Sequence, residues 1–158
     1  MALTAHPALF RRLLNWWPPF RGAGIRVTAI APDWSSVRVE LRLRLLNRNA
    51  IGTHFGGSLY SMTDPFYALM LMRRLGPDYL VWDQAAEIEF LKPGRGVVSA
   101  EFRLDEHHLE RLRREAADGS KLLPEYVVEV RDRDAELVAR VRKRLYVRLK
   151  RRARPAAA

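Results

Sequence analysis

"GSLYSMTDPFYALMLMRRLG", residues 57–76, is the stretch that decides the fold. It would make about five turns of helix at ~1.5 Å per residue, with apolar side chains on nearly every side. Gly76 and Pro77 end it, and Arg73 and Arg74 lie in the last turn, where the helix dipole favours cations. A helix of this kind is stable only when other elements cover it all round. We therefore predict a buried central helix.

Six strand-like segments flank this helix, two before it and four after it. They cover residues 24–32, 35–47, 79–94 and 96–104, and the two arms of 125–150 on either side of a turn at 132–134. The clearest alternation is in 35–47, where one face is apolar and the other is charged. Its predicted inward side chains are Val37, Val39, Leu41, Leu43 and Leu45. In the last strand we expect Leu137, Ala139, Val141, Leu145, Val147 and Leu149 to face inward.

Two further segments have helical features. Residues 6–20 carry apolar side chains at helical spacing and stop at Pro18 and Pro19, which predicts a short amphipathic N-terminal helix. Residues 105–119 begin with acids and end at a glycine, which indicates a surface helix or loop. An antiparallel sheet of about six strands can cover one apolar helix by curling around it. The sequence therefore predicts an α+β protein with the hot-dog architecture, as one domain over residues 1–150 followed by a disordered basic tail, 151–158.

Composition narrows the class of protein. The chain has 158 residues, 48% hydrophobic content and no cysteine, so packing alone must hold the fold. It has no apolar run long enough to span a membrane and no signal-peptide pattern, so we expect a cytoplasmic protein with no membrane partner. The net charge is +10, but residues 140–154 contain nine basic side chains and no acid, which leaves +1 elsewhere. We interpret this excess as one solvated strand face plus the tail.

The segment "NRNAIGTHFGGSLYSMTD", residues 47–64, precedes and enters the central helix. It resembles the signature of hot-dog acyl-CoA thioesterases of the phenylacetate-pathway type, and also a related branch catalogued as a domain of unknown function. When the glycine pair is aligned, Asn49 falls on the family's asparagine and Asp64 on its catalytic acid. The family's histidine directly precedes the glycines, whereas here Phe55 separates His54 from Gly56. Pro65, inside the predicted helix, is a second departure.

The resemblance implies roles that chemistry can rationalise. The free N–H of Gly57 at the helix start would stabilise the oxyanion of a thioester, with Gly56 shaping the turn. Asp64, partly desolvated in an apolar helix, would act as base or nucleophile. Asn49 would hold the attacking water or the thioester, and His54 would orient the thioester. We expect Gly56, Phe55 and Ser61 to contact the substrate; Ser61 has no histidine at a partner spacing that would make it a nucleophile.

Each of these residues also has a purely structural interpretation. Asp64 could cap a helix that begins at Pro65. Asn49 could be a turn residue, and His54 could be a structural or loop histidine. The two glycines could serve only close packing of helix against sheet.

The resemblance also implies partners. Coenzyme A would enter as part of an acyl-CoA or similar thioester substrate, with no separate cofactor, and arginines such as Arg95, Arg142 or Arg144 would meet its phosphates. Four histidines, scattered acids and no cysteine lead us to expect no metal. A homodimer, possibly a tetramer, would complete the pocket. The main alternative is a non-catalytic acyl-CoA-binding protein; a nucleic-acid-binding module, using the basic C-terminal face, is less favoured.

We assign the tryptophans mainly to packing: Trp16, Trp17, Trp34 and Trp82.

Overall fold

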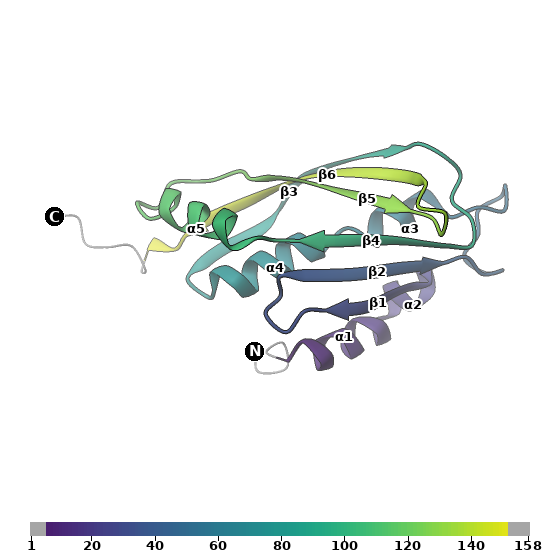
Figure 1. Cartoon of the computed structure of the whole chain (residues 1–158), viewed down its shortest axis with the longest axis horizontal. Coiled ribbons are helices and arrows are strands. Elements are labelled where there is room, and N and C mark those ends of the chain that lie inside the picture. The colour runs from purple at the N-terminus through teal and green to yellow at the C-terminus, as the bar shows by residue number, and fades with distance from the viewer. Residues whose placement is uncertain (1–5, 152–158) are drawn as a thin grey trace.

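Six antiparallel strands form one curved sheet in the computed structural model, which describes residues 6–151 (Figure 1). The strands are β1 Ile25–Ile30, β2 Ser36–Arg42, β3 Tyr79–Phe90, β4 Val97–Arg103, β5 Glu125–Arg131 and β6 Leu137–Leu149. Their order across the sheet is β1-β2-β4-β5-β6-β3, so β1 and β3 form its two edges. The predicted α+β fold is confirmed. The expected tail, apart from its first residue, lies outside the described residues.

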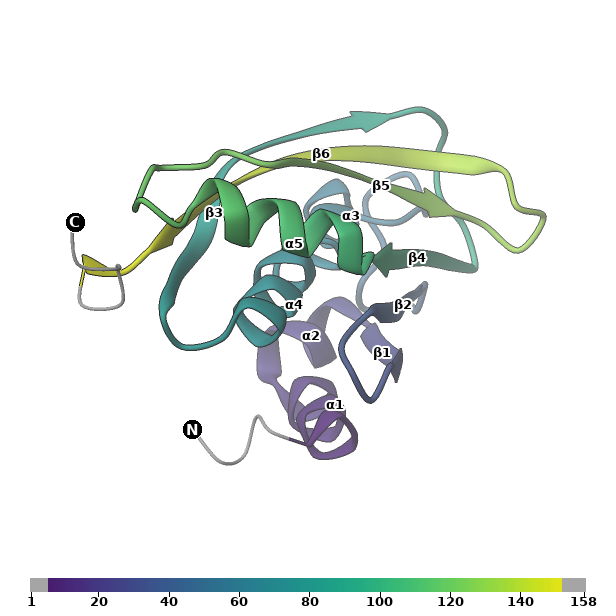
Figure 2. The ribbon, with the colours of Figure 1, turned by 60° about the vertical axis from the view of Figure 1, so that its left-hand side comes forward.

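The central helical segment packs against one face of the sheet (Figure 2) and consists of two helices, α3 Gly56–Ser61 and α4 Phe66–Leu75. The prediction of one unbroken helix is wrong in this detail. Between them, the N–H and the hydroxyl of Thr63 both donate to the carbonyl of Tyr60 at 2.8 Å, which closes a tight turn. Pro65 has no N–H to continue the helical bonding, and α4 begins directly after it.

Aromatic and sulfur-containing side chains of this segment form the centre of the core. Met62, Phe66 and Met70 are fully buried. The Phe66 ring lies 5.0 Å from that of Phe102 on β4 and 6.1 Å from that of Phe20 in the N-terminal region. The helix that the sequence predicts to be apolar all round is therefore covered from both sides, which is the condition for its stability.

The fewest paired positions between neighbouring strands of the sheet are those between β4 and β5. These strands pair at only two positions, Ser99 with Arg131 and Ala100 with Val130. Beyond them the strands spread apart toward α5 Glu106–Glu115, the helix that connects them (Figures 1 and 2). Leu109 and Leu112 of α5 are buried in the core, and Asp105 caps the helix by accepting a hydrogen bond of 2.7 Å from the His108 N–H. The predicted helix or loop at 105–119 is thus a capped helix.

The N-terminal region contains two helices, α1 Pro7–Trp16 and α2 Pro18–Ala23, rather than one. Pro18 starts α2, because proline at the first helical position loses no hydrogen bond. Asn15 fixes α1 to β1 through two bonds with the backbone of Val27, at 2.7 and 3.0 Å. Trp16 is 70% exposed, so the assignment of this tryptophan to packing is wrong. Within residues 6–151 no helix is long and apolar enough to cross a membrane.

The second strand ends earlier than its alternation suggests. β2 stops at Arg42, and Leu45, predicted to face inward, is 71% exposed in the following turn. Asn47 causes this turn: its side-chain oxygen accepts from the Arg44 N–H at 2.6 Å, and its amide group donates to the carbonyls of Ala23 and Arg42. The chain is thereby redirected toward the loop that leads into α3.

Candidate functional site

The loop before α3 is organised by Asn49. Its side-chain oxygen accepts hydrogen bonds from the backbone N–H groups of Ile51 and Thr53, at 3.1 and 3.0 Å. Its amide nitrogen donates to the Thr53 hydroxyl at 2.9 Å and to the His54 carbonyl at 3.1 Å. The amide group is thus fully occupied by its own loop. In this chain Asn49 fixes the position of His54, as the turn interpretation of this residue expects.

His54 is buried, with 3% of its surface exposed, and its backbone N–H donates to the Gly94 carbonyl at 3.0 Å. Neither ring nitrogen makes a hydrogen bond to any of the described residues. Burial lowers the pKa of His54, with the nearby backbone of Gly96 opposing the shift, so the ring is neutral at neutral pH. A buried polar group without a partner costs free energy unless a ligand or water satisfies it. His54 is therefore a side chain of this loop whose hydrogen-bonding groups are unused among the described residues, and both of its ring nitrogens are covered.

A hollow of about 330 Å³ lies beside this histidine. Its walls come from the loop, the start of α3 and the β3–β4 connection, and they are mainly apolar. The lining residues are Asn49, Ile51, Thr53, His54, Gly56, Leu59, Phe90, Leu91, Lys92, Pro93 and Gly94. The predicted site residues Asn49, His54 and Gly56 thus share one hollow, and Asp64 is not among the residues that line it.

Phe55, Gly57 and Ser61 are not among the residues that line this hollow. The Phe55 ring is packed so closely on Gly57 that a β-carbon at Gly57 would lie 2.4 Å from it. A side chain at position 57 would thus displace the exposed Phe55 ring. The Gly57 N–H, in the first turn of α3, has no acceptor within the helix. The Ser61 hydroxyl donates to the Gly57 carbonyl at 2.7 Å, a bond internal to α3. That bond gives Ser61 no base that would make it a nucleophile.

Asp64 lies in the turn between α3 and α4 and belongs to a second cluster of polar groups. Its Oδ1 accepts a hydrogen bond of 2.9 Å from the Tyr60 hydroxyl and lies 3.1 Å from the Lys143 ammonium. Lys143 also donates to the Asp64 backbone carbonyl, and its Nζ lies 2.9 Å from Asp83 Oδ1 as an ion pair that lacks hydrogen-bond geometry. The Asp64 side chain is 46% exposed and does not cap α4. Its Oδ2 makes no hydrogen bond or ion pair within residues 6–151.

The electrostatics of this cluster follow from burial. Burial raises the pKa of Asp83, and the Lys143 ammonium opposes that shift. Burial, with the bond to Asp64, raises the pKa of Tyr60 to about 12, so its hydroxyl stays a donor at neutral pH. The Lys143 side chain is completely buried, and a buried charge is tolerated only when paired. The cluster thus holds one carboxylate oxygen of Asp64 firmly and leaves the other free.

Sequence reasoning misses Tyr60, Asp83 and Lys143. It places Lys143 on the solvated basic face of the last strand, and that assignment is wrong because the side chain is buried. A signal was available: Val141 and Leu145 are predicted to face inward, and position 143 lies on the same face by alternation. A lysine at an inward position indicates a buried ion pair.

The other basic residues of β6 are exposed or half-buried and largely paired with acids. Arg140 pairs with Glu129 at 3.2 Å and Glu89 at 3.8 Å, and Arg144 pairs with Glu125 at 2.7 Å. Arg142 lies 4.0 Å from Glu89. The basic strand is therefore compensated by glutamates of β3 and β5. No group of three or more potential metal-binding side chains occurs in the part of the chain described here.

A curved antiparallel sheet around a central helix, with a glycine pair at the head of that helix, defines a hot-dog protein. The chain belongs to the family described as a domain of unknown function, DUF4442, whose model matches residues 7–147. No curated protein matches the sequence.

Solved structures of hot-dog proteins are similar to the chain in fold. A Pseudomonas aeruginosa protein of unknown function, PA5026, described as a probable thioesterase, is 22% identical over 90% of this chain and 95% of its own, with a TM-score of 0.78. Thioesterase HI1161 from Haemophilus influenzae is 15% identical over 89% of each chain, with a TM-score of 0.65. A mutant of the phenylacetic acid degradation protein PaaI from Thermus thermophilus is 24% identical over 82% of this chain and 98% of its own, with a TM-score of 0.57. At these identities the likeness establishes the fold.

Proposed function

We propose that the protein hydrolyses a thioester, with coenzyme A as the thiol carrier, in a site shared between two copies of the chain. The observation that carries this proposal is the buried imidazole of His54, which lines a mainly apolar hollow and makes no hydrogen bond to the described residues. An acyl group suits the apolar walls, and a movement of the loop that uncovers a ring nitrogen of His54 would let the thioester become its partner. The names of the solved hot-dog structures, which include thioesterases, agree with this chemistry.

The reaction follows from the free groups of the two clusters. Water attacks the thioester carbonyl and passes a proton to Oδ2 of Asp64, the oxygen that no described residue engages. The N–H of Gly57 stabilises the negative charge that develops on the carbonyl oxygen. The carbon–sulfur bond then breaks, and the leaving thiolate takes the proton from Asp64. The products are a carboxylic acid and free coenzyme A thiol.

A second copy of the chain completes the site in this proposal. Asp64 does not line the hollow of its own chain, so the acid that serves one hollow comes from the partner. β3 is an edge strand of the sheet, with Trp82 and Phe90 about half exposed, and offers an edge for pairing. Arg95 hydrogen-bonds to the Gly52 carbonyl at 3.4 Å, next to the hollow, and is the arginine we propose for the phosphates of coenzyme A. Arg142 and Arg144 already face glutamates.

A non-catalytic acyl-CoA-binding protein is the second candidate. The position of Phe55 between His54 and the glycine pair favours it, because both ring nitrogens of that histidine are covered. Such a protein would bind the thioester in the same hollow and release no thiol.

A panel of acyl-CoA thioesters, assayed for free thiol, tests the proposal. We expect turnover by the wild type and a loss of about 10²-fold or more in kcat for Asp64→Asn, as expected when a general base is removed. The matched control is Asp78→Asn, an exposed acid whose side chain makes no hydrogen bond or ion pair within residues 6–151, and it should keep full activity. Equal rates in the two variants would remove Asp64 from the mechanism. Binding without turnover by the wild type would establish the second candidate.

A further inference from the structure

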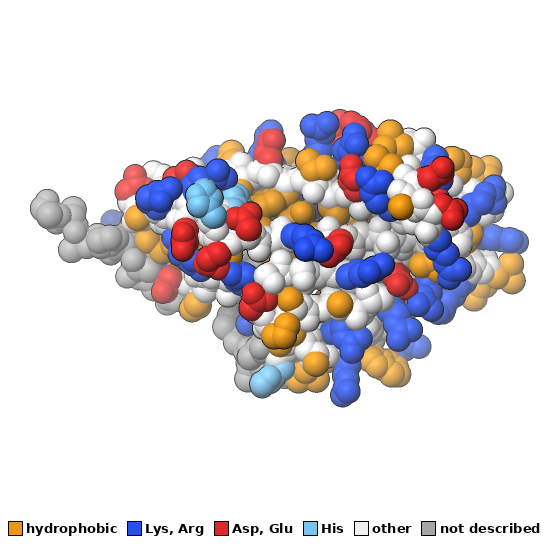
Figure 3. Space-filling model, viewed as in Figure 1, with side chains coloured by type: hydrophobic (Ala, Val, Ile, Leu, Met, Phe, Trp, Pro, Cys, Tyr) orange, Lys and Arg blue, Asp and Glu red, His pale blue; other side chains and the backbone are white. Residues whose placement is uncertain are grey.

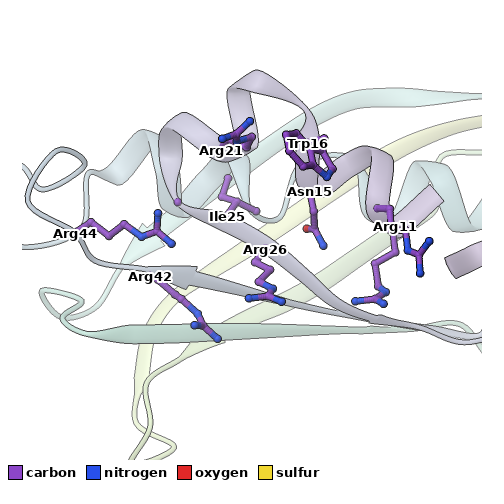
Figure 4. Close-up of a pocket in the computed structure, with 10 residues that line it drawn as sticks. Arg11, Asn15, Trp16, Arg21, Ile25, Arg26, Arg42 and Arg44 are labelled. Carbon is purple, nitrogen blue, oxygen red and sulfur yellow. The ribbon is translucent and has the colours of Figure 1, made fainter. Parts of the chain in front are cut away.

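An arginine-lined hollow of about 430 Å³ lies between the N-terminal helices and the strands β1 and β2, at the sheet edge opposite β3 (Figure 4). Arginines reach it from four elements and the turn after β2. The lining residues are Arg11, Arg12, Asn15, Trp16, Arg21, Gly24, Ile25, Arg26, Arg42 and Arg44. On the face shown in Figure 3, basic side chains gather over this part of the molecule. None of the described acidic residues lines the hollow.

The charge of this arginine-lined hollow is almost uncompensated. Of the six arginines, only Arg42 has an acidic partner among the described residues, namely Glu40 at 2.9 Å. The other five arginines form no ion pair with any residue in 6–151, in contrast to the arginines of β6. Like charges gathered on one surface repel each other, and a bound anion would relieve that repulsion.

The positions of these arginines are set by the fold. Asn15 is occupied by the backbone of Val27, so it anchors α1 on β1 and keeps the helix arginines opposite those of the strands. The Arg21 guanidinium lies over the ring of Trp16, 4.7 Å from its centroid. Figure 4 shows this pair on the helical side and Arg26 and Arg42 on the strands. The hollow is thus lined from two sides by groups that donate hydrogen bonds and carry positive charge.

We propose that this hollow binds a phosphate-bearing anion. The planar guanidinium group bonds phosphate oxygens in pairs, and several arginines converging from separate elements suit a group with more than one negative charge. This proposal is independent of the thioesterase function, because the hollow shares no lining residue with the one beside His54.

The phosphate can come from two sources, a soluble phosphate compound or the headgroup of an anionic phospholipid. Trp16 also lines an adjoining apolar hollow of about 480 Å³, whose other walls are Phe10, Leu13, Leu14, Trp17, Pro65 and Leu69. An exposed tryptophan beside arginines is typical of proteins that bind at a lipid surface. The expectation of no membrane partner rests on the lack of a long apolar run, which concerns membrane spanning and not surface binding.

Two binding measurements on the full chain test the proposal. Inorganic pyrophosphate is titrated by calorimetry, and sedimentation measures binding to vesicles of phosphatidylcholine with and without phosphatidylserine. The test variant is Arg11→Ala with Arg21→Ala. The matched control is Arg142→Ala with Arg144→Ala, which removes the same charge from β6. Circular dichroism and thermal unfolding establish that each variant is folded.

Saturable binding of pyrophosphate, weakened at least about tenfold per arginine in the test variant and unchanged in the control, would establish a site for soluble phosphate compounds. Binding only to phosphatidylserine vesicles, weakened about fivefold per arginine in the test variant alone, would establish the lipid source. A fluorescence change that disappears in Trp16→Phe would locate either ligand. The proposal is overturned if neither probe binds, or if the two double variants lose binding equally.

Discussion

Lys143 and His54 are both buried polar side chains, but Lys143 has hydrogen-bond and ion-pair partners and the His54 ring has none among the described residues. Lys143 lies between Asp64 and Asp83 and also donates to a backbone carbonyl. His54 is equally enclosed, and neither of its ring nitrogens has a partner among the described residues. A paired buried charge stabilises the fold, whereas an unpaired buried ring lowers stability, and in the proposed function a ligand supplies its partner. In the proposed function, the Lys143 cluster positions the acid and the hollow beside His54 receives the ligand.

Lys143→Met gives the largest expected effect on stability. It leaves the carboxylates of Asp64 and Asp83 together without their cation, so we expect a loss of about 3–5 kcal/mol in the free energy of unfolding, measured with urea. Arg142→Met, on the exposed side of the same strand, is the control and should change stability by no more than about 0.5 kcal/mol. Similar losses in both variants would show that Lys143 contributes no more than an ordinary surface residue.

His54→Leu should lower turnover and leave stability nearly unchanged. We expect the free energy of unfolding to stay within about 1 kcal/mol of the wild type, because an apolar side chain replaces an unsatisfied polar one. At the same time kcat/KM for the best thioester should fall at least about tenfold, the loss of about 1.4 kcal/mol of transition-state stabilisation. The matched variant is His108→Leu, which removes a hydrogen bond of 2.8 Å to Tyr126 and should lower stability with no loss of turnover. A large destabilisation by His54→Leu would indicate a structural histidine.

The pH dependence of the unfolding free energy tests whether the buried His54 ring is neutral. The pKa of His54 is lowered by burial, so below 6.5 the unfolded chain takes up a proton that the folded protein does not. Stability is therefore complete above pH 6.5 and decreases as the pH falls toward the folded pKa, by at most about 1.4 kcal/mol per pH unit for one proton. Burial lowers the pKa of His108 as well, and the two contributions add.

The contribution of Asp83 to the pH dependence of stability has the opposite sign. Its pKa is raised above 3.8, so its contribution decreases as the pH rises through the folded value. The difference between wild type and His54→Leu, measured by thermal unfolding from pH 4 to 8, isolates the histidine. A flat difference would contradict a neutral buried ring.

Tyr60→Phe is the smallest expected change. It removes the hydrogen bond to Asp64 Oδ1 and leaves Lys143 in place, so we expect a loss of about 0.5–1 kcal/mol in unfolding free energy. Tyr79→Phe is a comparison on β3, since the Tyr79 hydroxyl makes no hydrogen bond to any residue that the structure describes. If Tyr60→Phe destabilised the protein as much as Lys143→Met, the hydroxyl rather than the ammonium would organise the cluster.

The sequence predicts the order of elements well because hydrophobic periodicity is a local property. The alternation from Val37 to Leu41 and the apolar run into α4 both reflect burial directly. Prediction from the sequence fails where contacts with distant residues determine where an element ends. Leu45 continues the alternation of β2, but the hydrogen bonds of Asn47 to Ala23 and Arg42 turn the chain before that residue. Pro65 separates α3 from α4, and the apolar pattern of residues 57–76 does not indicate this break.

The candidate site is predictable in its loop and not in its ion pairs. The motif leads to His54 and Asp64 because both lie within 18 residues of sequence, 47–64. Asp83 and Lys143 reach Asp64 from β3 and β6, and their convergence depends on strand pairing that a single sequence does not specify. The same limit applies to the arginine-lined hollow, whose members come from residues 11–44 and become neighbours only when α1 folds back on β1.

The two paired positions between β4 and β5 have a mechanical consequence. The sheet is in effect two three-stranded ribbons joined by a short seam, with side-chain packing from α5 taking over where backbone hydrogen bonds stop. Packing yields more readily than a continuous ladder, so opening of the molecule should begin along this seam, with α5 detaching first.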